Sequence, residues 1–588
     1  VDRGNRIRTE RYAAVFFHIR IVAEHHRIAY VRRMRFNRYI FRHLIFLFKN
    51  NIARNIFHRI RFLHSLLFRR HGSKDYIIFA AVHMVIIPNH YISSTIGYII
   101  PCPHHRHTFH IPACISISVD RIIDAGCICC TCKDIPGADD PRLKWVIDYH
   151  TGAFKRLREG GYEKYVAMTN EYNKEGEFLA FVGYEAHSME HGDHVALNYD
   201  LDAPLVECTS IEDWKRKARG HKVFITPHHM GYQTGYRGYN WNFFTEGDQT
   251  PFVEMYSRHG LAESDQGDYS YLHDMGPRQW EGTIQCGLEQ GKKFGIMGST
   301  DQHAGYPGSY GDGRIGILAE SLSRDKIWDA MKNRHVCCAT GDKINIDFRL
   351  NDAFPGDVVR GNSRRIYLNV EGGSCIDYID IVKNRKCIAR LSGPLLPEMP
   401  EGDMVRCKVK VDFGWNREEQ YVHWQGKLSI NKGTINAVEP CFRGAAFTSP
   451  QPGESEFETK VNRIVSVTSK DAELDMYSSK NPNTTTPATQ AVILDVTMPK
   501  DGVITAEFNG KKFEHSLGEL LEGSRSHFMI GWLSEAILFN RAMPESCFTV
   551  EHYMEDTQPE RDTDYYYVRV RQRDQQWAWS SPIWVERT

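Results

Sequence analysis

The sequence predicts an α/β domain with a largely parallel sheet, followed by a β-rich, sandwich-like C-terminal region. In the first part, short apolar runs alternate with stretches of helical spacing, as in proteins whose strands are joined by helices. Polar side chains of the metal-ligand type come directly after several of these runs. Downstream of Asp342, alternating and apolar runs follow one another with turns between them, which is typical of β-sandwiches.

The chain has 588 residues and no net charge, but its charges are unevenly distributed. Residues 1–134 carry 18 arginines and three lysines against seven acidic residues, whereas residues 135–588 carry 52 basic and 66 acidic residues. A chain of this length exceeds what one hydrophobic core accommodates. We therefore expect three regions: an anomalous basic segment at 1–134, an α/β barrel at 135–345 and a β-rich region at 346–588.

Three interpretations of residues 1–134 compete. An arginine-rich arm could neutralise nucleic-acid phosphates, and the apolar stretch Ile77–Ile100 suggests a membrane segment. That stretch is interrupted by His83, Pro88 and His90, so it lacks the run of about 18 apolar residues that a span requires. Arginine outnumbers lysine six to one, and no helical or strand periodicity persists. We favour an off-frame or disordered segment, and expect neither nucleic-acid nor membrane binding.

Two motifs in this segment imitate metal sites. His104–His110 is rich in histidine, and Cys127–Cys132 has the pattern C-x-C-C-x-C. Neither has the paired C-x₂-C spacing with a distant second pair that zinc modules use. We interpret both as consequences of the local composition.

Candidate metal ligands stand at the ends of the apolar runs in residues 135–345. The run 178–184 ends on Glu185, and the run 194–199 begins at His194. The run 222–226 precedes Pro227-His228-His229, and Phe252-Val253 precedes Glu254. The run 294–297 precedes Asp301 and His303 in a D-x-H spacing, before a glycine-rich loop. Helices are expected over 139–157, over 210–219 with Ser210 as its N-cap, and after Ser323.

These strand ends predict a metal centre. The carboxyl ends of barrel strands meet on one face, so their side chains would converge. A single histidine is more often a buried core residue, but ligand types at four separate strand ends favour a site. A mixed set of His, Asp and Glu favours Zn, Mn or Fe over Ca or Mg.

Several motifs resemble one metallohydrolase superfamily. They are GYEAHSMEHGDH (183–194), PHHMGYQTGYRGYNW (227–241), VEMYSRHGLAESD (253–265), LHDMGPR (272–278), GSTDQHAGYPGSYGDGR (298–314) and RHVCCATGDKI (334–344). Together they resemble the PHP-type (polymerase and histidinol phosphatase) enzymes, in the branch known as the domain-of-unknown-function 3604 family. The resemblance covers residues 136–588. It implies a distorted β/α barrel with two or three divalent metal ions, which hydrolyses phosphoester substrates.

The resemblance also implies roles for individual residues. Glu185 matches a bridging carboxylate, Asp301 and His303 match the closing ligand pair, and His194 with one of His228 and His229 matches the middle ligands. Further candidates are Arg237 and Arg314 as phosphate holders, His259 and His273 as acid/base or ligand, His187 and His191 beside the ligands, and Asp193 as the residue that orients His194.

The N-terminal part departs from the superfamily pattern. An H-x-H pair is expected on a first strand upstream of Pro136, where the anomalous segment stands. His105 and His107 have this spacing but lack a strand and the glycine and acidic neighbours. We therefore expect an under-coordinated site and a chain that is inactive as it stands. The alternative is a non-catalytic ligand-binding protein on a degenerate scaffold, with the β-rich region holding the ligand.

The remaining features of the chain are less specific. Trp577, Trp579 and Trp584 could form a carbohydrate platform, but their alternation favours packing in a core. Residues 479–489 are polar and predict a loop. Nine cysteines follow residue 134 without a disulfide framework; with no signal-peptide pattern, this favours the cytoplasm.

Overall fold

The structure is a computed structural model that describes a large part of the chain. The described residues are 111–113, 123–124, 141, 157–186, 188, 190–208, 210–247, 249–267, 277–301, 308–416, 421–444, 460–479, 489–532 and 534–588. All of them belong to the compact unit Tyr76–Thr588. Most of segment 1–134, the expected helix before residue 157, and His187, His273 and His303 lie outside the described residues. The three predicted regions stay predictions.

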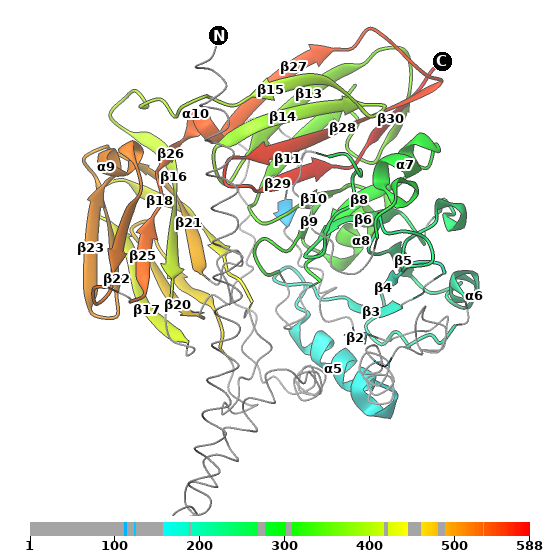
Figure 1. Cartoon of the computed structure of the whole chain (residues 1–588), viewed down its shortest axis with the longest axis horizontal. Coiled ribbons are helices and arrows are strands. Elements are labelled where there is room, and N and C mark those ends of the chain that lie inside the picture. The colour runs from blue at the N-terminus through cyan, green and yellow to red at the C-terminus, as the bar shows by residue number, and fades with distance from the viewer. Residues whose placement is uncertain are drawn as a thin grey trace, which may run out of the picture. The chain divides into compact units, whose positions relative to one another are not determined.

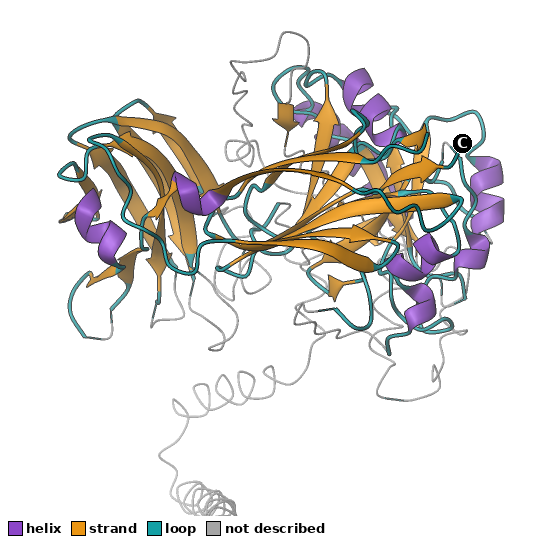
Figure 2. Cartoon of the chain, turned by 90° about the horizontal axis from the view of Figure 1, so that it is seen from above, coloured by secondary structure: helices purple, strands orange, loops and turns teal. Residues whose placement is uncertain are grey.

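Strands dominate the described residues, and the helices among them are short (Figure 2). The helices are α5 (Tyr162–Tyr172), α6 (Ile211–Lys217), α7 (Ile284–Glu289), α8 (Arg324–Lys332), α9 (Leu517–Glu522) and α10 (Glu545–Phe548). Ser210 begins α6 by accepting a hydrogen bond from the Asp213 amide, and Ser323 begins α8 by accepting one from the Lys326 amide. Both predicted N-caps are confirmed.

Two small sheets occupy the region predicted to be a parallel barrel. One has the order β2 (Ile123–Asp124), β3 (Val182–Ala186), β4 (His194–Asn198), β5 (Val223–Pro227); the other has the order β7 (Gly260–Leu261), β6 (Phe252–Ser257), β8 (Gly295–Gly298). Pairs β2/β3 and β6/β8 are parallel, as predicted, but β4 is antiparallel to both of its neighbours. None of the described sheets closes into a barrel.

The prediction of a largely parallel sheet was therefore wrong for β3, β4 and β5. The physical reason is the short connection between β3 and β4. It joins Ala186 to His194, and these two residues are also paired with each other across the two strands. A parallel crossover needs a dozen or more residues, and this loop is shorter. The chain must return beside β3, so β4 runs antiparallel to it and β5 runs parallel to β3 again.

Larger sheets build the rest of the described chain. A nine-stranded sheet contains β1 (Ile111–Ala113), β9 (Arg314–Ala319), β10 (Val336–Ala339), β12 (Val358–Arg360), β14 (Ile376–Lys383), β15 (Lys386–Ser392), β28 (Thr563–Gln572), β29 (Trp577–Ser580) and β30 (Ile583–Glu586). A three-stranded sheet contains β11 (Asn345–Leu350), β13 (Arg365–Glu371) and β27 (Thr549–Glu555).

Two further sheets lie in the part of the chain that the sequence predicts to be β-rich and sandwich-like (Figure 1). One contains β16 (Val405–Gly414), β18 (Thr434–Cys441), β21 (Gln490–Met498), β24 (Arg525–Phe528), β25 (Ala536–Phe539) and β26 (Met543–Pro544). The other contains β17 (Val422–Ile430), β19 (Arg463–Val467), β20 (Asp471–Ser478), β22 (Val503–Phe508) and β23 (Lys511–Ser516). Side chains from both sheets share one hydrophobic core, as in a sandwich.

The C-terminal strands pack against the metal-ligand region through a buried carboxylate, Glu263. It accepts hydrogen bonds from the Tyr567 hydroxyl (2.7 Å), Arg569 Nη1 (3.1 Å) and Trp579 Nε1 (3.1 Å). Trp577, Trp579 and Trp584 are buried, which confirms their predicted place in a core. Because Glu263 follows β7, these contacts fix the segment after β6 to β28 and β29.

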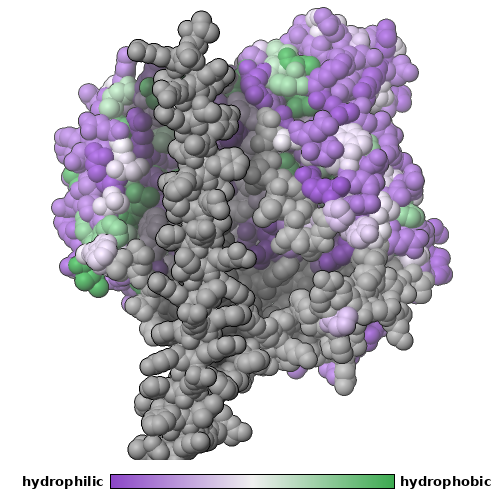
Figure 3. Space-filling view, viewed as in Figure 1, coloured by the Kyte–Doolittle hydropathy of each residue, from purple (hydrophilic) through white to green (hydrophobic). Residues whose placement is uncertain are grey.

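The described part of the face seen in Figure 3 is largely polar. Hydrophilic side chains predominate on it, and apolar ones form small patches. Within the described ranges, we find no helix with the length and apolar character that crossing a membrane requires.

Replacing Glu263 with Ala should destabilise the protein. The substitution removes the acceptor of the Trp579 Nε1–H and one of the two carboxylates that hold the partly buried Arg569, which keeps its ion pair with Asp380, so a loss of about 1–3 kcal/mol is expected. Urea denaturation measures the change. Glu473→Ala, on the exposed side of β20, is the matched control and should shift stability by less than about 0.5 kcal/mol. Equal stability of the two variants would contradict this role of Glu263.

Candidate metal centre

Strand register brings the first candidate ligands to one sheet edge. Ala186, the last residue of β3, pairs with His194, the first residue of β4, and His194 pairs with Pro227, the last residue of β5. Glu185 and His228 therefore stand at the same edge, one residue before and one residue after these partners. The backbone N–H of His228 also donates to the Asp193 carbonyl oxygen at 2.8 Å, which holds the two chain segments together.

The β6/β8 sheet contributes the remaining ligands. Its two strands are parallel, so the residues that follow them lie at the same end. His259 comes two residues after β6, and Asp301 comes three residues after β8. His259 Nε2 lies 3.2 Å from Asp301 Oδ2, which shows that the two strand ends do converge.

Five side chains form two overlapping groups that could hold metal ions. The first is Glu185, His228 and His229, and the second is His229, His259 and Asp301. In each group, the possible ligand atoms lie within 4.8 Å of one another. His229 belongs to both groups, and all five residues are at most 9% exposed. The arrangement offers imidazole nitrogens and carboxylate oxygens to two neighbouring positions.

The spacing of these atoms fits ligands around a shared cation. His228 Nε2 lies 3.6 Å from Glu185 Oε1 and 3.7 Å from Asp301 Oδ2. His229 Nε2 lies 3.8 Å from Glu185 Oε1 and 3.7 Å from Asp301 Oδ2. These separations exceed ordinary hydrogen bonds. Two ligands bound tetrahedrally at about 2.0–2.1 Å lie about 3.3 Å apart. The donor set therefore fits a divalent transition metal.

A carboxylate behind His228 fixes the orientation of its ring. His228 Nδ1 lies 2.6 Å from Glu254 Oε2, so the Nδ1–H donates to the carboxylate and Nε2 faces the ligand group. Ser299 Oγ donates to the same Glu254 oxygen at 2.5 Å. Metal-binding histidines are commonly held in this way by a carboxylate on the second nitrogen. The backbone N–H of His229 also donates to Glu254 Oε1, at 3.4 Å.

The backbone at the centre is unusual in three places. His229, Arg237 and Asp301 have φ values of 52°, 65° and 49°, in the left-handed region. Such conformations cost about 1–3 kcal/mol and cluster at functional sites. In addition, the buried Nδ1 of His229 has no hydrogen-bond partner among the described residues. A buried imidazole nitrogen without a partner is itself unfavourable.

Arg237 stands beside the ligand group on a tightly packed loop. Its Nε donates to Asp193 Oδ2 at 2.6 Å, and its Nη2 lies 3.8 Å from Glu185 Oε1. A Cβ at Gly238 would overlap the Tyr232 carbonyl oxygen, so only glycine allows this approach. Asp193 was predicted to orient His194; its side chain instead holds Arg237 and accepts from the Ser188 amide.

The three histidines at the sheet edge have different protonation behaviour. Burial lowers the pKa of His228, but the charges of Glu254 and Glu185 outweigh it and raise the pKa to about 10. Burial and the neighbouring His228 charge hold the pKa of His229 well below its usual value. Burial lowers the pKa of His194 to about 3. His228 therefore carries the proton that balances the carboxylates.

The structure brings some predicted site residues together and separates others. Glu185, His228, His229, His259 and Asp301 converge. His194 belongs to neither group: its Nδ1 lies 3.0 Å from the Gly192 carbonyl oxygen, and its ring packs on Tyr239. Arg314 Nη1 lies 3.9 Å from Glu439 Oε1 in the β-rich region. His303 lies outside the described residues.

The sequence did not predict the supporting roles of two residues that lie behind the ligands. The sequence predicts Glu254 as one of the ligand-type residues at strand ends, but this residue instead supports His228 from behind, together with Ser299. Both are explained by the β6/β8 pairing, which places Glu254 opposite Met297, two residues before Ser299. A carboxylate inside an apolar strand was the signal that could have identified Glu254.

Comparisons with known proteins give limited likenesses. No protein-family model matches the chain. An uncharacterized protein from Chlamydia trachomatis is 24% identical in an alignment of 243 residues that covers 36% of this chain and 38% of that protein. The chain thus spans less than half the length of this relative. A crystal structure from Bacteroides vulgatus, of a two-domain protein containing a predicted PHP-like metal-dependent phosphoesterase, aligns with 64% of this chain and 82% of its own, at TM-score 0.20 and 12% identity.

Metal binding should release a proton from His228. With a pKa of about 10 in the metal-free protein, this imidazole is protonated at pH 7 and must lose a proton to bind through Nε2. Metal affinity should therefore rise about tenfold per pH unit and level off above pH 10. Calorimetric titration of Zn²⁺ in buffers of different ionisation enthalpy measures the released protons.

Glu254→Gln serves as the comparison for this titration. It removes the largest charge that raises the pKa of His228, so fewer protons should be released at pH 8 than from the unaltered chain. The same proton count for both proteins would show that His228 does not exchange its proton for metal.

Proposed function

We propose that this chain is a metal-dependent hydrolase that acts on phosphoesters. The observation that carries the proposal is the pair of buried ligand groups that share His229. The donor chemistry favours Zn, Mn or Fe, since imidazole and carboxylate ligands occur together around these ions. The sequence resemblance to PHP-type enzymes supports the same reaction class.

Each side chain has a distinct task in this proposal. Glu185 and His228 would hold one cation and His259 and Asp301 a second, and His229, whose Nε2 has a single lone pair, would complete one of these two groups. Glu254 keeps the His228 ring in the orientation and tautomer that present Nε2. A bound divalent cation supplies Lewis acidity and the means to activate a water at neutral pH. His259, which the sequence suggests as acid/base or ligand, serves here as a ligand.

Arg237 is the candidate for contact with the substrate. Its side chain is 25% exposed, and its guanidinium lies 3.8 Å from the Glu185 oxygen at the ligand group. Guanidinium groups bind phosphoryl oxygens with strong, charge-assisted hydrogen bonds. The ion pair with Asp193 fixes this guanidinium at the edge of the centre. We therefore assign Arg237 the role of binding a substrate phosphate; Arg314 and His303 stay as predicted participants.

Asp301→Asn tests the proposal with little disturbance of the backbone. Asparagine tolerates the left-handed conformation at this position, so the change removes charge and keeps the fold. Bound metal should fall from at least about one ion per chain to a small fraction. Hydrolysis of bis(p-nitrophenyl) phosphate and p-nitrophenyl phosphate should fall by about 100-fold or more. Elemental analysis and absorbance assays measure the two effects.

Asp352→Asn is the matched control. Asp352 is an exposed residue with a φ of 70° in a turn far along the chain from the ligands. It should leave metal content and turnover unchanged. A purified chain that binds no metal would contradict the proposal. Metal binding without turnover of either ester would favour the alternative, a non-catalytic ligand-binding protein.

A further inference from the structure

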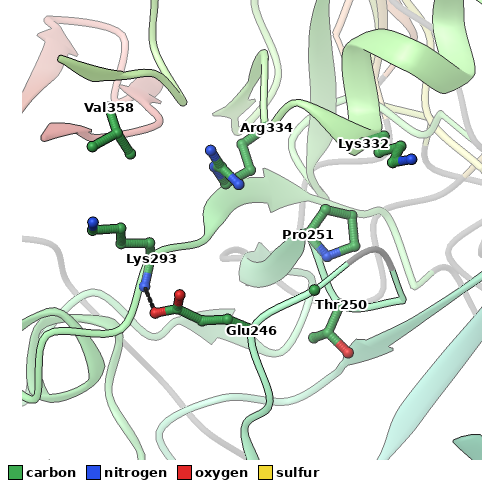
Figure 4. A pocket seen from close by; sticks show the side chains of 8 residues that line it. Glu246, Thr250, Pro251, Lys293, Lys332, Arg334 and Val358 are labelled. Carbon is green, nitrogen blue, oxygen red and sulfur yellow. Dashed lines mark hydrogen bonds between the residues drawn. The ribbon is translucent and has the colours of Figure 1, made fainter.

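A cavity of about 390 Å³ lies apart from the metal centre (Figure 4). It is lined by Glu246, Gly247, Thr250, Pro251, Lys293, Lys332, Arg334 and Val358. Its volume lies within the range of about 300–1,000 Å³ that small-molecule sites occupy. Figure 4 shows side chains from several separate segments arranged around it.

The cavity and the metal centre lie at opposite ends of the same two strands. Thr250 and Pro251 come just before β6, and Lys293 comes two residues before β8. The metal ligands His259 and Asp301 come after the same strands. A strand of six residues is about 20 Å long. A ligand in the cavity therefore cannot touch the candidate metal ligands.

Positive charge dominates the lining of the cavity. Lys293, Lys332 and Arg334 face one acidic lining residue, Glu246. Glu246 accepts a hydrogen bond from the Lys293 backbone N–H at 3.2 Å, which holds its carboxylate at one side. Lys293 Nζ pairs with Glu586 at 2.7 Å, and Glu586 also pairs with Arg360. Of the charged side chains in the described lining, three are therefore cationic and one is anionic.

Arg334 stands at a position where glycine is the usual residue. The Arg334 N–H donates to the Met331 carbonyl oxygen and the His335 N–H donates to that of Ala330. This pattern is the Schellman ending of α8, and it places Arg334 in the left-handed region with a φ of 65°. A side chain there costs about 1 kcal/mol relative to glycine. Arg334 therefore occupies a position where the backbone conformation favours glycine.

The guanidinium of Arg334 is held by a backbone carbonyl group and an aromatic ring, and the charges of Asp357 and Glu246 act on it from a distance. Its Nε donates to the Gly356 carbonyl oxygen at 2.9 Å, and the group lies 5.9 Å from the Trp584 ring centroid. Within the described ranges, no carboxylate forms an ion pair with it. Burial lowers the pKa of Arg334, which shows the cost of holding this charge out of water. An anion in the cavity would offset this cost.

We propose that this cavity is a second ligand site, which binds the phosphate group of a small molecule. Arg334 provides a fixed fork for two phosphate oxygens, and Lys293 and Lys332 add charge on either side. Thr250 and Pro251 join this site to β6, whose other end carries His259. Inorganic phosphate and a sugar phosphate share the recognised group, so both are used as probes.

Calorimetry on the full-length, EDTA-treated protein tests the site. Removing metal excludes binding of phosphate to a cation at the metal centre, and Arg237, which remains there, is the same in every chain compared. Inorganic phosphate and ribose 5-phosphate are titrated at constant ionic strength into the unaltered chain, Arg334→Gly and Lys332→Gln. Arg385→Gly is the matched control, because Arg385 is an exposed arginine with a φ of 69° in another turn.

Arg334→Gly should weaken binding of the preferred probe by about 10–100-fold, the loss of a charge-assisted hydrogen bond. Its urea midpoint should match that of Arg385→Gly, since glycine suits both positions. Lys332→Gln, at an exposed position, should weaken binding several-fold. Tighter binding of ribose 5-phosphate than of phosphate would assign the site to phosphate esters, and the reverse order to the free ion. Absence of binding to the unaltered chain, or unchanged affinity in both cavity variants, would overturn the proposal.

Discussion

The candidate centre depends on the burial of carboxylates against imidazoles, at separations that are mostly longer than ordinary hydrogen bonds. Charges removed from water are expensive unless they are closely paired. Here the separations between Nε2 and the Glu185 and Asp301 oxygens run from 3.2 to 3.8 Å, in a site where these residues are at most 9% exposed. A divalent cation among these atoms would satisfy all of them at once. Two of these residues, His229 and Asp301, also have backbone dihedrals in the left-handed region.

Part of the site could be predicted because ligand types stood at strand ends. The sequence placed Glu185, His228 and Asp301 directly after apolar runs, and the ends of those runs do meet. The predicted directions of the strands that carry these residues were partly wrong, because a hydrophobic run does not indicate in which direction its strand runs. The short connection before His194 held that information, since it excludes a crossover helix. His194 shows how far a strand-end position alone predicts a ligand. It lies at the same sheet edge as the candidate ligands, but its Nδ1 faces the Gly192 carbonyl oxygen.

Other features of the structure depend on contacts between segments far apart along the chain, which no local sequence pattern predicts. Glu263 binds Tyr567, Arg569 and Trp579, which are about 300 residues away along the chain. The positive backbone dihedral of Arg334 follows from the end of α8, and its place in a cavity follows from segments near Thr250 and Lys293. The β-rich character of the C-terminal region was predictable, because alternation along each strand records which face is buried. The pairing order of its sheets was not.

Anomalous X-ray diffraction from crystals soaked in Zn²⁺ or Mn²⁺ tests the central claim most directly. Data collected on both sides of the metal absorption edge would locate each ion without reference to activity. We expect anomalous peaks within about 2.0–2.3 Å of His228 or His229 nitrogens and of Glu185 or Asp301 oxygens. Crystals with ordered side chains at this sheet edge and no anomalous peak among them would contradict the account.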